Sequence, residues 1–256
     1  MLAIDRHEKI MQLLVKNKTI SVKTLCDILQ ASEATIRRDL TLLENENKLA
    51  RTHGGASISD SINLNYEATF NQKELMASDE KRRIARRAFE SLRPHDSLVL
   101  DAGTTTLELA RMIGESTLPL MVITNATTIS TIISKNEQVE FYVLGGRVRL
   151  NTQSTVGALA IDILRRFNVS KAFVGVNGIT VENGLTTPDL EEAEIKKAML
   201  SIAEERIVLT DSTKFQKVAR CQISPLSMVD KIITDTQLNN QYYDQFIQHD
   251  IIIERV

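Results

Sequence analysis

The chain has 256 residues, of which 43% are hydrophobic and 25% are charged, and its formal net charge at pH 7 is -2. These values are ordinary for a globular protein. The near-neutral charge disfavours a uniformly basic protein that coats DNA, so any contact with nucleic acid has to be local. Two cysteines far apart in the chain and four scattered histidines predict neither a disulfide framework nor a metal site.

The N-terminal residues are charged from Asp5 to Lys9, which is unlike a signal peptide. No apolar run approaches the roughly 20 residues that a membrane span needs. We therefore expect a cytoplasmic protein that makes no contact with a membrane. Residues 5–15 predict a first helix with one apolar face.

Two helices separated by a very short connection are predicted next. Residues 21–29 have Ser21 at a capping position and an apolar stripe, and Ser32 is placed to cap a further helix over residues 32–40. Only two residues lie between these helices, which is the spacing of a helix-turn-helix corner.

The third predicted helix has the surface expected of a DNA-recognition helix. At about 3.6 residues per turn its apolar side chains share one stripe, whereas Arg37, Arg38 and Thr41 lie on the opposite face. The side chains expected on that outer face are small, basic or hydroxyl-bearing, since Ala34 also lies there, and the pattern predicts no acidic residue on it. Taken alone, the same residues also fit an ordinary solvated helix that carries two arginines.

Residues 48–56 predict a small hairpin with a Gly-Gly tip, which would be the wing of a winged helix. Residues 19–20 are expected to add a short strand to it. Arg51 and His53 would then lie beside the phosphate backbone, and Gly54 would let the main chain approach it closely. We place the predicted DNA-binding domain at residues 1–57.

A linker is predicted at residues 58–77, where serines, asparagines and isolated apolar residues replace any periodic pattern. The helix expected over residues 79–89 is strongly basic, which is compatible with a second DNA contact. Its apolar stripe, which includes Ile84 and Ala88, favours a solvated helix that packs on the next domain.

Short apolar runs alternate with segments of helical length from Ser97 to the C-terminus. The runs lie at residues 98–100, 120–123, 141–144, 172–174, 207–209, 232–233 and 251–253. Unbroken apolar runs of this length are typical of strands that are buried on both faces of a parallel sheet. Residues 78–256 are therefore predicted to form an α/β domain with a mostly parallel sheet.

Polar or glycine residues follow nearly every predicted strand. The first such stretch begins with Asp101, passes through Gly103 and opens a helix with Thr104, Thr105 and Thr106. Backbone N–H groups, hydroxyls and the helix dipole at this point favour a phosphate. A threonine that simply caps the helix is the plainer alternative.

Ligands of open α/β sheets bind beyond the carboxyl ends of the strands, so the stretches that follow the other strands should meet the first one. Asn125, Gly145 and the turn from Asp211 to Lys214 stand at these ends. Together they favour a pocket for a phosphorylated ligand. Lys214 would supply a cation, and the side chains of Asp101, Asn125 and Asp211 would share hydrogen bonds with sugar hydroxyls.

Residues 191–197 carry acid–base pairs at helical spacing, which more often stabilise an exposed helix than form a site. The sequence contains no recognisable nucleophile–base–acid arrangement and no metal-ligand spacing. We therefore predict no catalytic residue, no metal-binding residue and no cofactor. The carboxylates at the sheet edge leave an enzyme open as an alternative.

These motifs together resemble the DeoR family of bacterial transcriptional regulators, over nearly the whole chain. The stretches SEATIRRDL and RTHGGA resemble its helix-turn-helix and wing. Six further stretches resemble the sensor domain of that family and occur in the same order: DAGTTT, ITN, GGR, FVGVNGI, GLTTPDLEEAEIKKAM and DSTKF. The resemblance implies a repressor of sugar or nucleoside catabolic operons whose DNA binding is released or altered by a phosphorylated sugar or related metabolite. It also implies a sensor domain similar to ribose-5-phosphate isomerase, without implying catalysis.

The resemblance further implies which residues act, and it places base recognition on Thr35, Arg37 and Arg38. The full set of predicted DNA-contacting residues is Ser32, Thr35, Arg37, Arg38, Thr41, Arg51, His53 and Gly54. The predicted effector-contacting residues are Asp101, Gly103, Thr104, Thr105, Thr106, Asn125, Gly145, Glu192, Lys196, Asp211 and Lys214.

Three positions depart from the family pattern. Asn47 stands where glycine often precedes the wing, and asparagine tolerates the left-handed turn needed there. Ala126 replaces a frequent serine and removes a hydroxyl from the predicted pocket. Gln216 replaces a frequent glycine after Phe215 and is expected to alter how that loop closes. The last two departures bear on the identity of the effector.

We interpret the chain as a homo-oligomeric repressor, dimeric or tetrameric, of a carbohydrate catabolic operon. Its expected partners are double-stranded operator DNA and a phosphorylated sugar. The rival is a sugar-phosphate isomerase or hydrolase that carries a winged helix as an interaction module and would turn over a phosphosugar. An architectural DNA coater is disfavoured by the near-neutral charge.

Overall fold

The computed structural model describes residues 2–17, 19–46, 48–57 and 69–256. The chain divides into two compact units, Met1–Ala68 and Thr69–Val256, and each unit has hydrophobic core residues of its own. Most of the predicted linker, residues 58–68, and the departure at Asn47 lie outside the described residues. In the part of the chain that is described, no helix has the length and apolar character needed to cross a membrane.

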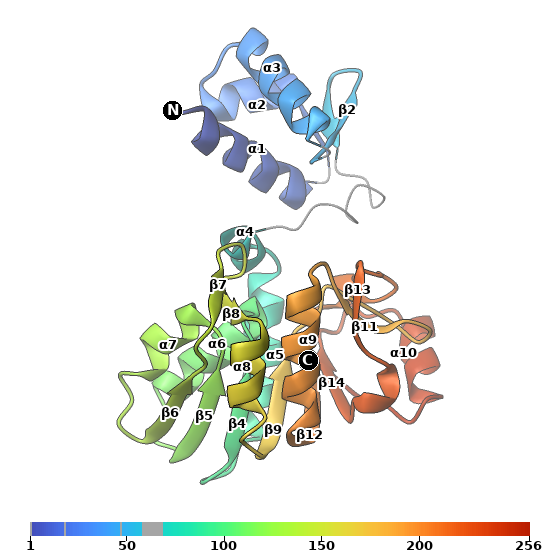
Figure 1. Cartoon of the computed structure of the whole chain (residues 1–256). Helices are drawn as coiled ribbons and strands as arrows, with labels where there is room; N and C mark the ends of the chain where they lie inside the picture. The colour runs from blue at the N-terminus through green and yellow to red at the C-terminus, as the bar shows by residue number, and fades with distance from the viewer. Residues whose placement is uncertain (1, 18, 47, 58–68) are drawn as a thin grey trace. The chain divides into compact units, whose positions relative to one another are not determined.

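The first unit is a winged helix (Figure 1). Its helices are α1 (Ala3–Asn17), α2 (Val22–Leu29) and α3 (Glu33–Asn45), and its strands are β1 (Thr19–Ser21), β2 (Ala50–Thr52) and β3 (Gly55–Ser57). The three strands form an antiparallel sheet in the order β1-β3-β2. The predicted hairpin and the predicted third strand are both confirmed. The tip differs from the predicted Gly-Gly pair, because His53 and Gly54 form the turn and Gly55 is the first residue of β3.

Serine caps determine where α2 and α3 begin. Ser21 Oγ accepts a hydrogen bond from the N–H of Thr24 at 3.0 Å, and Ser32 Oγ accepts one from the N–H of Thr35 at 3.2 Å. Gln30, between the two helices, has a left-handed φ of 51° that turns the chain at the corner. The apolar faces of the helices then meet in a core that includes Ile10, Leu14, Leu25, Leu29, Ile36, Leu40 and Leu43.

A buried carboxylate ties α1 to α3 in this unit. Asp39 is 3% exposed, and its Oδ1 lies 3.0 Å from Arg6 Nη2 and 2.9 Å from His7 Nε2. Burial would raise the pKa of Asp39, but the hydrogen bonds from Arg6 and His7 outweigh burial and hold this pKa below its ordinary value. The ionised Asp39 therefore stabilises the folded unit.

The second unit is built on a seven-stranded sheet in the order β15-β14-β12-β9-β4-β5-β6, and all of its strand pairs are parallel. The strands are β4 (Ser97–Leu100), β5 (Leu120–Thr124), β6 (Val139–Val143), β9 (Val169–Val174), β12 (Ala203–Leu209), β14 (Lys231–Thr234) and β15 (Ile252–Arg255). Each strand overlaps one of the apolar runs in the sequence. The predicted α/β class with a parallel sheet is confirmed.

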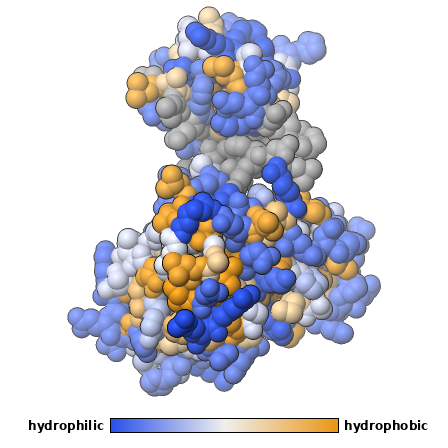
Figure 2. Space-filling model, viewed as in Figure 1, coloured by the Kyte–Doolittle hydropathy of each residue, from blue (hydrophilic) through white to orange (hydrophobic). Residues whose placement is uncertain are grey.

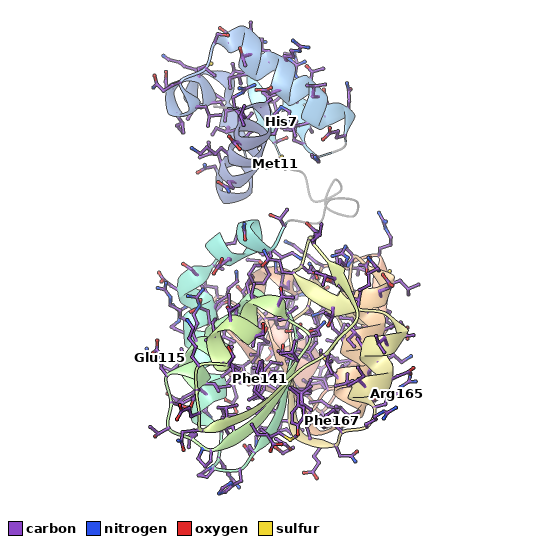
Figure 3. The ribbon with its side chains drawn as sticks, turned by 60° about the vertical axis from the view of Figure 1, so that its left-hand side comes forward. His7, Met11, Glu115, Phe141, Arg165 and Phe167 are labelled. Carbon is purple, nitrogen blue, oxygen red and sulfur yellow. The ribbon has the colours of Figure 1, made fainter. Side chains whose placement is uncertain are left out.

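Helices cover both faces of this sheet (Figures 1 and 3). One face carries α5 (Ser78–Glu90), α6 (Thr104–Gly114) and α7 (Thr127–Ile133), and the other carries α8 (Ala158–Leu164), α9 (Leu190–Ser201) and α10 (Asn240–Ile247). Side chains of β4 alternate between the two cores, since Leu98 and Leu100 belong to the first and Val99 to the second. In α5, Ile84 and Ala88 are buried, so the packing predicted for this basic helix is confirmed.

Two small antiparallel additions, which the sequence patterns do not predict, extend from the carboxyl ends of the main strands. The hairpin β7 (Arg147–Arg149) and β8 (Ser154–Val156) follows β6, and a sheet of β10 (Gly178–Thr180), β11 (Gly184–Thr187) and β13 (Cys221–Ser224) follows β9 and β12. Short 3-10 turns, η2 (Ser212–Lys214) and η3 (Leu226–Met228), flank β13. These additions lie at the end of the sheet where a pocket is predicted.

A further helix, α4 (Phe70–Leu75), falls within the predicted linker at residues 58–77. Phe70 is buried in the core that underlies α5, α6 and α7. Its N–H donates to the carbonyl of Asn151, in the β7–β8 hairpin, at 2.9 Å. Residues from Phe70 onward therefore pack as part of the second unit.

Replacing Asp39 by Asn is expected to lower the unfolding free energy of the first unit by about 2 kcal/mol at neutral pH, because Arg6 loses a charge-assisted partner. Since the folded pKa of Asp39 is lowered, its contribution is present above the unfolded pKa and disappears as the pH falls through the folded pKa. The difference between wild type and variant should therefore shrink in acid. Urea denaturation followed by circular dichroism measures it. Asp27→Asn, an exposed acid of α2, is the control, and a variant at position 39 as stable as that control would contradict the assignment.

Candidate functional site

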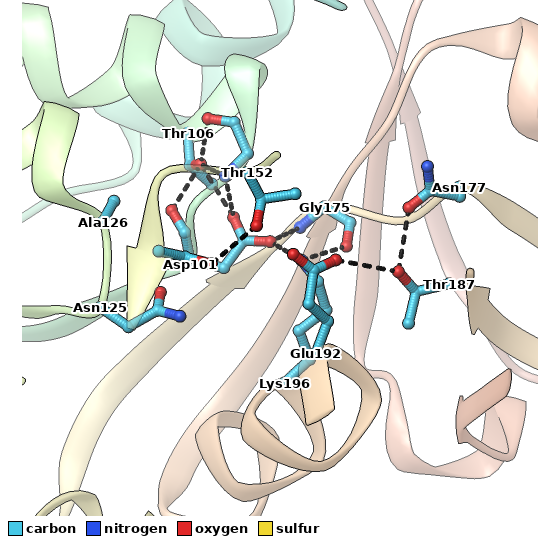
Figure 4. Close-up of polar contacts among 12 residues, drawn as sticks. Asp101, Thr106, Asn125, Ala126, Thr152, Gly175, Asn177, Thr187, Glu192 and Lys196 are labelled. Atoms are coloured by element: carbon cyan, nitrogen blue, oxygen red, sulfur yellow. Dashed lines mark hydrogen bonds and ion pairs between the residues drawn. The ribbon is translucent and has the colours of Figure 1, made fainter. Parts of the chain in front are cut away.

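The carboxyl ends of five neighbouring parallel strands meet at one edge of the second unit. Polar or glycine residues follow these strands directly or after one residue: Asp101 after β4, Asn125 after β5, Gly175 after β9, Asp211 after β12 and Asp235 after β14. The parallel sheet thus brings the predicted site residues to one edge, as the sequence analysis expected. Figure 4 shows the centre of this edge.

Asp101 is almost completely buried at this edge, at 1% exposed. Its carboxylate accepts hydrogen bonds from the N–H of Gly103 at 3.1 Å, from Thr106 Oγ1 at 2.8 Å and from the N–H of Gly175 at 2.9 Å. It also forms an ion pair with Lys196 of α9 (Figure 4). A single carboxylate therefore joins the ends of β4 and β9 to the start of α6 and to α9.

Gly103 has a steric reason to be glycine. A Cβ atom at this position would lie 2.9 Å from Asp101 Oδ1, which is closer than Cβ atoms approach other heavy atoms. Without a side chain, its N–H reaches the carboxylate while the helix starts at the next residue. Thr104 is half-buried and Thr105 buried in this first turn of α6. The hydroxyl of Thr106 is already hydrogen-bonded to Asp101. In this stretch, therefore, Gly103 and Thr106 bond to Asp101, whereas the side chains of Thr104 and Thr105 do not.

Helix α9 brings Glu192 and Lys196, one turn apart, to the same edge. Lys196 Nζ donates to the carbonyl of Gly175 at 3.0 Å in addition to its ion pair. Glu192 is also buried, and its Oε1 lies 3.3 Å from Arg149 Nη1 while its Oε2 lies 3.4 Å from Thr187 Oγ1. Both side chains are thus held in place by neighbours from other elements.

Asn125, at the end of β5, has one unused hydrogen-bonding atom. Its Nδ2 donates to the carbonyl of Thr155 at 2.9 Å, and because a carbonyl only accepts, this bond fixes the orientation of the amide. The Oδ1 atom is buried and has no hydrogen-bond partner within the described residues. Ala126 next to it is buried in the core beneath α7, so its methyl group packs there.

Asp211 and Lys214 lie on the other side of the edge, in the turn after β12. Asp211 is buried and accepts a hydrogen bond from the N–H of Thr213 at 3.0 Å. Burial would raise the pKa of Asp211, but the charge of Lys214 and the hydrogen bonds of Thr213 hold it below its ordinary value. The ammonium group of half-buried Lys214 has neither a hydrogen bond nor an ion pair within the described residues.

The predicted effector residues thus fall into three groups. Asp101, Gly103, Thr106 and Lys196 form one hydrogen-bonded network. Glu192 lies beside it on α9, one turn before Lys196, and Thr104 and Thr105 lie beside it in the first turn of α6. Asn125 and the exposed Gly145 lie on the side of β5 and β6, and Asp211 and Lys214 lie on the side of β12. Among the described residues, no hydrogen bond or ion pair joins either flank to the central network.

Two further residues of this edge, Arg149 and Thr187, are not among the predicted site residues. Arg149 of β7 approaches Glu192 and also lies 3.4 Å from Asp189, whose carboxylate caps α9. Thr187 of β11 lies 3.1 Å from Asn177 Oδ1. Their strands are only three or four residues long, so local periodicity is too short to reveal them. The alternation of Arg147, Val148 and Arg149 is the one local sign of a strand.

A separate groove of about 460 Å³ lies beside this edge, on the side of α4. It is lined by Phe70, Asn71, Glu74, Leu107, Arg111, Thr127, Thr128, Thr131, Ile132 and Gln153. None of the predicted effector residues is in its wall. The groove and the polar edge are therefore distinct features.

On the first unit, the outer face of α3 differs from the prediction in one respect. The sequence pattern predicts no acid on this face, but Glu33 forms an ion pair with Arg37 at 2.6 Å. The prediction was wrong because the two residues are four apart, which places them on neighbouring turns of one helix side. Arg38 is exposed and has no hydrogen bond or ion pair within the described residues.

The wing is connected to α3 through Arg51. Its Nη1 donates to Thr41 Oγ1 at 3.1 Å, and its backbone N–H donates to Glu44 Oε1 at 3.0 Å. Thr41 Oγ1 in turn donates to the carbonyl of Arg37 at 2.9 Å. His53 and Gly54 are exposed at the tip of the hairpin.

Comparison with known proteins matches both units to one family. Residues 6–62 match the model of the DeoR-like helix-turn-helix domain, and residues 76–236 match that of the DeoR C terminal sensor domain. The chain belongs to the DeoR family. This membership makes it a DNA-binding transcriptional regulator and decides against the isomerase or hydrolase that the sequence left open.

Relatives of this DeoR-family chain match it over nearly its whole length. An uncharacterized HTH-type transcriptional regulator of Haemophilus influenzae is 36% identical over 238 residues, which are 93% of this chain and 91% of the relative. The lactose phosphotransferase system repressor of Lactococcus lactis subsp. lactis is 34% identical over 250 residues, which are 97% of each chain. Among solved structures, ribose 5-phosphate isomerase A from Methanocaldococcus jannaschii matches 54% of each chain with a TM-score of 0.41 and 18% identity.

Replacing Lys196 by Met is expected to lower the unfolding free energy of the second unit by about 3 kcal/mol, because Asp101 would keep a buried charge without its cation. Adding Asp101→Asn should recover part of this loss, since neither buried charge then remains. Urea denaturation of both variants measures the two values. Lys197→Met, at the exposed neighbouring position, should stay within about 0.5 kcal/mol of wild type. A Lys196→Met variant as stable as that control would contradict the ion pair.

Proposed function

We propose that this DeoR-family regulator represses a carbohydrate catabolic operon and that a phosphorylated sugar controls its binding to operator DNA. The name of the Lactococcus lactis relative, a lactose phosphotransferase system repressor that matches along 97% of both chains, supports the carbohydrate part. Since the operator is genomic DNA, we place the protein in the cytoplasm.

The open polar groups at the sheet edge carry the effector part of the proposal. A sugar hydroxyl needs an acceptor such as Asn125 Oδ1, which is buried and has no partner within the described residues. A phosphate needs a cation and N–H donors, which Lys214 and the first turn of α6 provide. The strands that carry Asn125 and Lys214 are three positions apart, or about 14 Å. A phosphosugar and a flexible lysine side chain together span that distance.

The bonding state of each residue suggests a division of roles within the predicted set. Asp101, Gly103, Thr106 and Lys196 hold the edge in shape, because their polar atoms are already bonded to one another. The residues that we propose to contact the effector itself are Thr104, Thr105, Asn125, Gly145, Glu192, Asp211 and Lys214. Of these, Glu192 and Asp211 also have hydrogen-bond partners, but the partners lie outside that network. Binding by a preformed edge costs little conformational entropy.

For DNA, we propose that Arg38 and Arg37 read the major groove and that Thr35 and Thr41 support them. Ser32, at the start of α3, and Arg51, His53 and Gly54 of the wing would contact the phosphate backbone. Arg38 is the residue most available for a base, since it alone of the two arginines has no acidic partner within the described residues. Arg37 would have to leave Glu33 first.

We also propose that the protein binds its operator as a homo-oligomer, a dimer or a tetramer. Helix-turn-helix proteins read two half-sites as symmetric dimers. Val148 and Leu150 of the β7–β8 hairpin and Leu159 of α8 are exposed, Leu150 to 85%. Figure 2 shows hydrophobic residues gathered at the surface over these elements. Such a patch supports self-association.

Replacing Arg38 by Ala should weaken operator binding about tenfold or more, the range of a lost base contact, with thermal unfolding unchanged. Fluorescence anisotropy at fixed salt, on DNA that flanks the gene for this protein and on a scrambled competitor, measures the affinity and its selectivity. Arg166→Ala, an exposed arginine of the second unit, is the matched control. Operator affinity equal to that of the control would remove Arg38 from the recognition surface.

Replacing Lys214 by Ala should leave operator binding intact and reduce the response to the effector at least about tenfold, because the phosphate loses its cation. The same anisotropy assay, repeated over a panel of sugar phosphates, measures this response. Lys197→Ala, an exposed lysine of α9, serves as the control. A variant at position 214 that responds like wild type would exclude this lysine from the effector site.

A further inference from the structure

Lys81 occupies a position that is unfavourable for a lysine. It is 5% exposed and lies at the end of the first turn of α5, where the helix dipole disfavours a cation. Burial lowers the pKa of Lys81 to about 8. A charged group kept in such a place needs specific partners.

The partners of Lys81 are backbone carbonyls of the segment that precedes α5. Its Nζ donates to the carbonyl of Met76 at 2.5 Å and to that of Lys73. These carbonyls belong to the end of α4 and the turn after it, where helical hydrogen bonds run out. Ala77, between α4 and α5, has a left-handed φ of 49°. Lys81 thus holds the corner between the two helices closed.

The charge of Lys81 is balanced by groups from three other elements. The start of α5 is connected to the turn after β12 through the residues that follow β14: Glu80 Oε1 accepts a hydrogen bond from Gln237 Nε2 at 3.2 Å, and Asp235 Oδ2 accepts one from the N–H of Ser212 at 2.7 Å. In that turn, Asp211 favours and Lys214 disfavours the protonated form of Lys81. Glu108 of α6 and Glu74 of α4 also favour that form. Lys81 therefore lies between the proposed effector loop and α4, the first helix of the second unit after the DNA-binding unit.

We propose that Lys81 is a positioning residue that couples the Asp211–Lys214 turn to the corner between α4 and α5. An anion bound to Lys214 neutralises the charge that repels Lys81, so the ammonium group holds the carbonyls of Lys73 and Met76 more firmly. The corner between α4 and α5 then becomes more ordered, at the point where the chain enters the second unit from the DNA-binding unit. This coupling rests on the proposed function, which places an anionic effector at the turn.

The link between the turn and the corner is testable without any effector. Amide hydrogen exchange of residues 73–77 in the full chain, corrected for the intrinsic effect of pH, should lose protection with a midpoint near the pKa of Lys81, about 8. Lys214→Ala should move this midpoint upward by about half a pH unit, and Asp211→Asn should move it downward. Lys81→Met should show no midpoint, and Arg86→Met, exposed on the same helix, should match wild type.

The consequence for regulation is tested with the sugar phosphate that most alters operator affinity of the wild type. Lys81→Met should bind that sugar phosphate and the operator, but the ratio of operator affinities with and without it should fall to within about twofold of one. A purely structural Lys81 would lower protection at residues 73–77 and leave this ratio intact, which would overturn the proposal. Midpoints that stay in place in both Lys214→Ala and Asp211→Asn would overturn it as well. If no sugar phosphate changes the operator affinity of the wild type, the proposal of a sugar-phosphate effector is wrong. The exchange experiment then still decides whether Lys81 connects the Asp211–Lys214 turn to the corner between α4 and α5.

Discussion

A buried carboxylate at the centre of the sheet edge shapes the second unit. Removing such an ion from water costs several kcal/mol, and only a full set of donors and a cation offsets that cost. The donors of Asp101 come from the α6 turn, from Gly175 and from Lys196. Elements that are distant in the chain must therefore be in place together before this charge is satisfied. The polar groups on either side of this carboxylate lie at the ends of other strands of the same sheet, Asn125 after β5 and Asp211 after β12.

The distinction between satisfied and open polar groups separates the fold from the sites. Asp101 and Lys196 have used their bonding capacity on each other and on the backbone, whereas Asn125 Oδ1 and Lys214 have capacity left within the described residues. The first unit has the same arrangement. Asp39 is hydrogen-bonded to Arg6 and His7, whereas Arg38 has no hydrogen bond or ion pair within the described residues. In both units, fixed charges hold a few open groups in defined positions, which lowers the entropic cost of binding.

Much of this architecture follows from local sequence patterns, and the remainder depends on contacts between distant residues. The strands of the parallel sheet follow from apolar runs, and the helix starts follow from Ser21 and Ser32, since both signals are local. The strands of the β7–β8 hairpin and of the sheet that contains β13 are too short to show a local pattern. In that sheet, paired residues such as Leu185 and Ser224 are also far apart in the chain. The same limit explains why the sequence patterns do not reveal the ion pair between Asp101 and Lys196, since the two residues lie 95 positions apart. The ion pair of Glu33 and Arg37 is different, since its spacing was visible in the sequence.

Thermodynamic reciprocity gives the most direct test of the account, which holds that one chain binds a sugar phosphate and an operator in a coupled manner. If the sugar phosphate changes operator affinity by some factor, the operator must change sugar-phosphate affinity by the same factor. Calorimetric titration of the sugar phosphate into the free protein and into its complex with operator DNA measures that factor. The account predicts two different dissociation constants, with a ratio equal to the change in operator affinity. Binding of the sugar phosphate with the same dissociation constant in both titrations would contradict it.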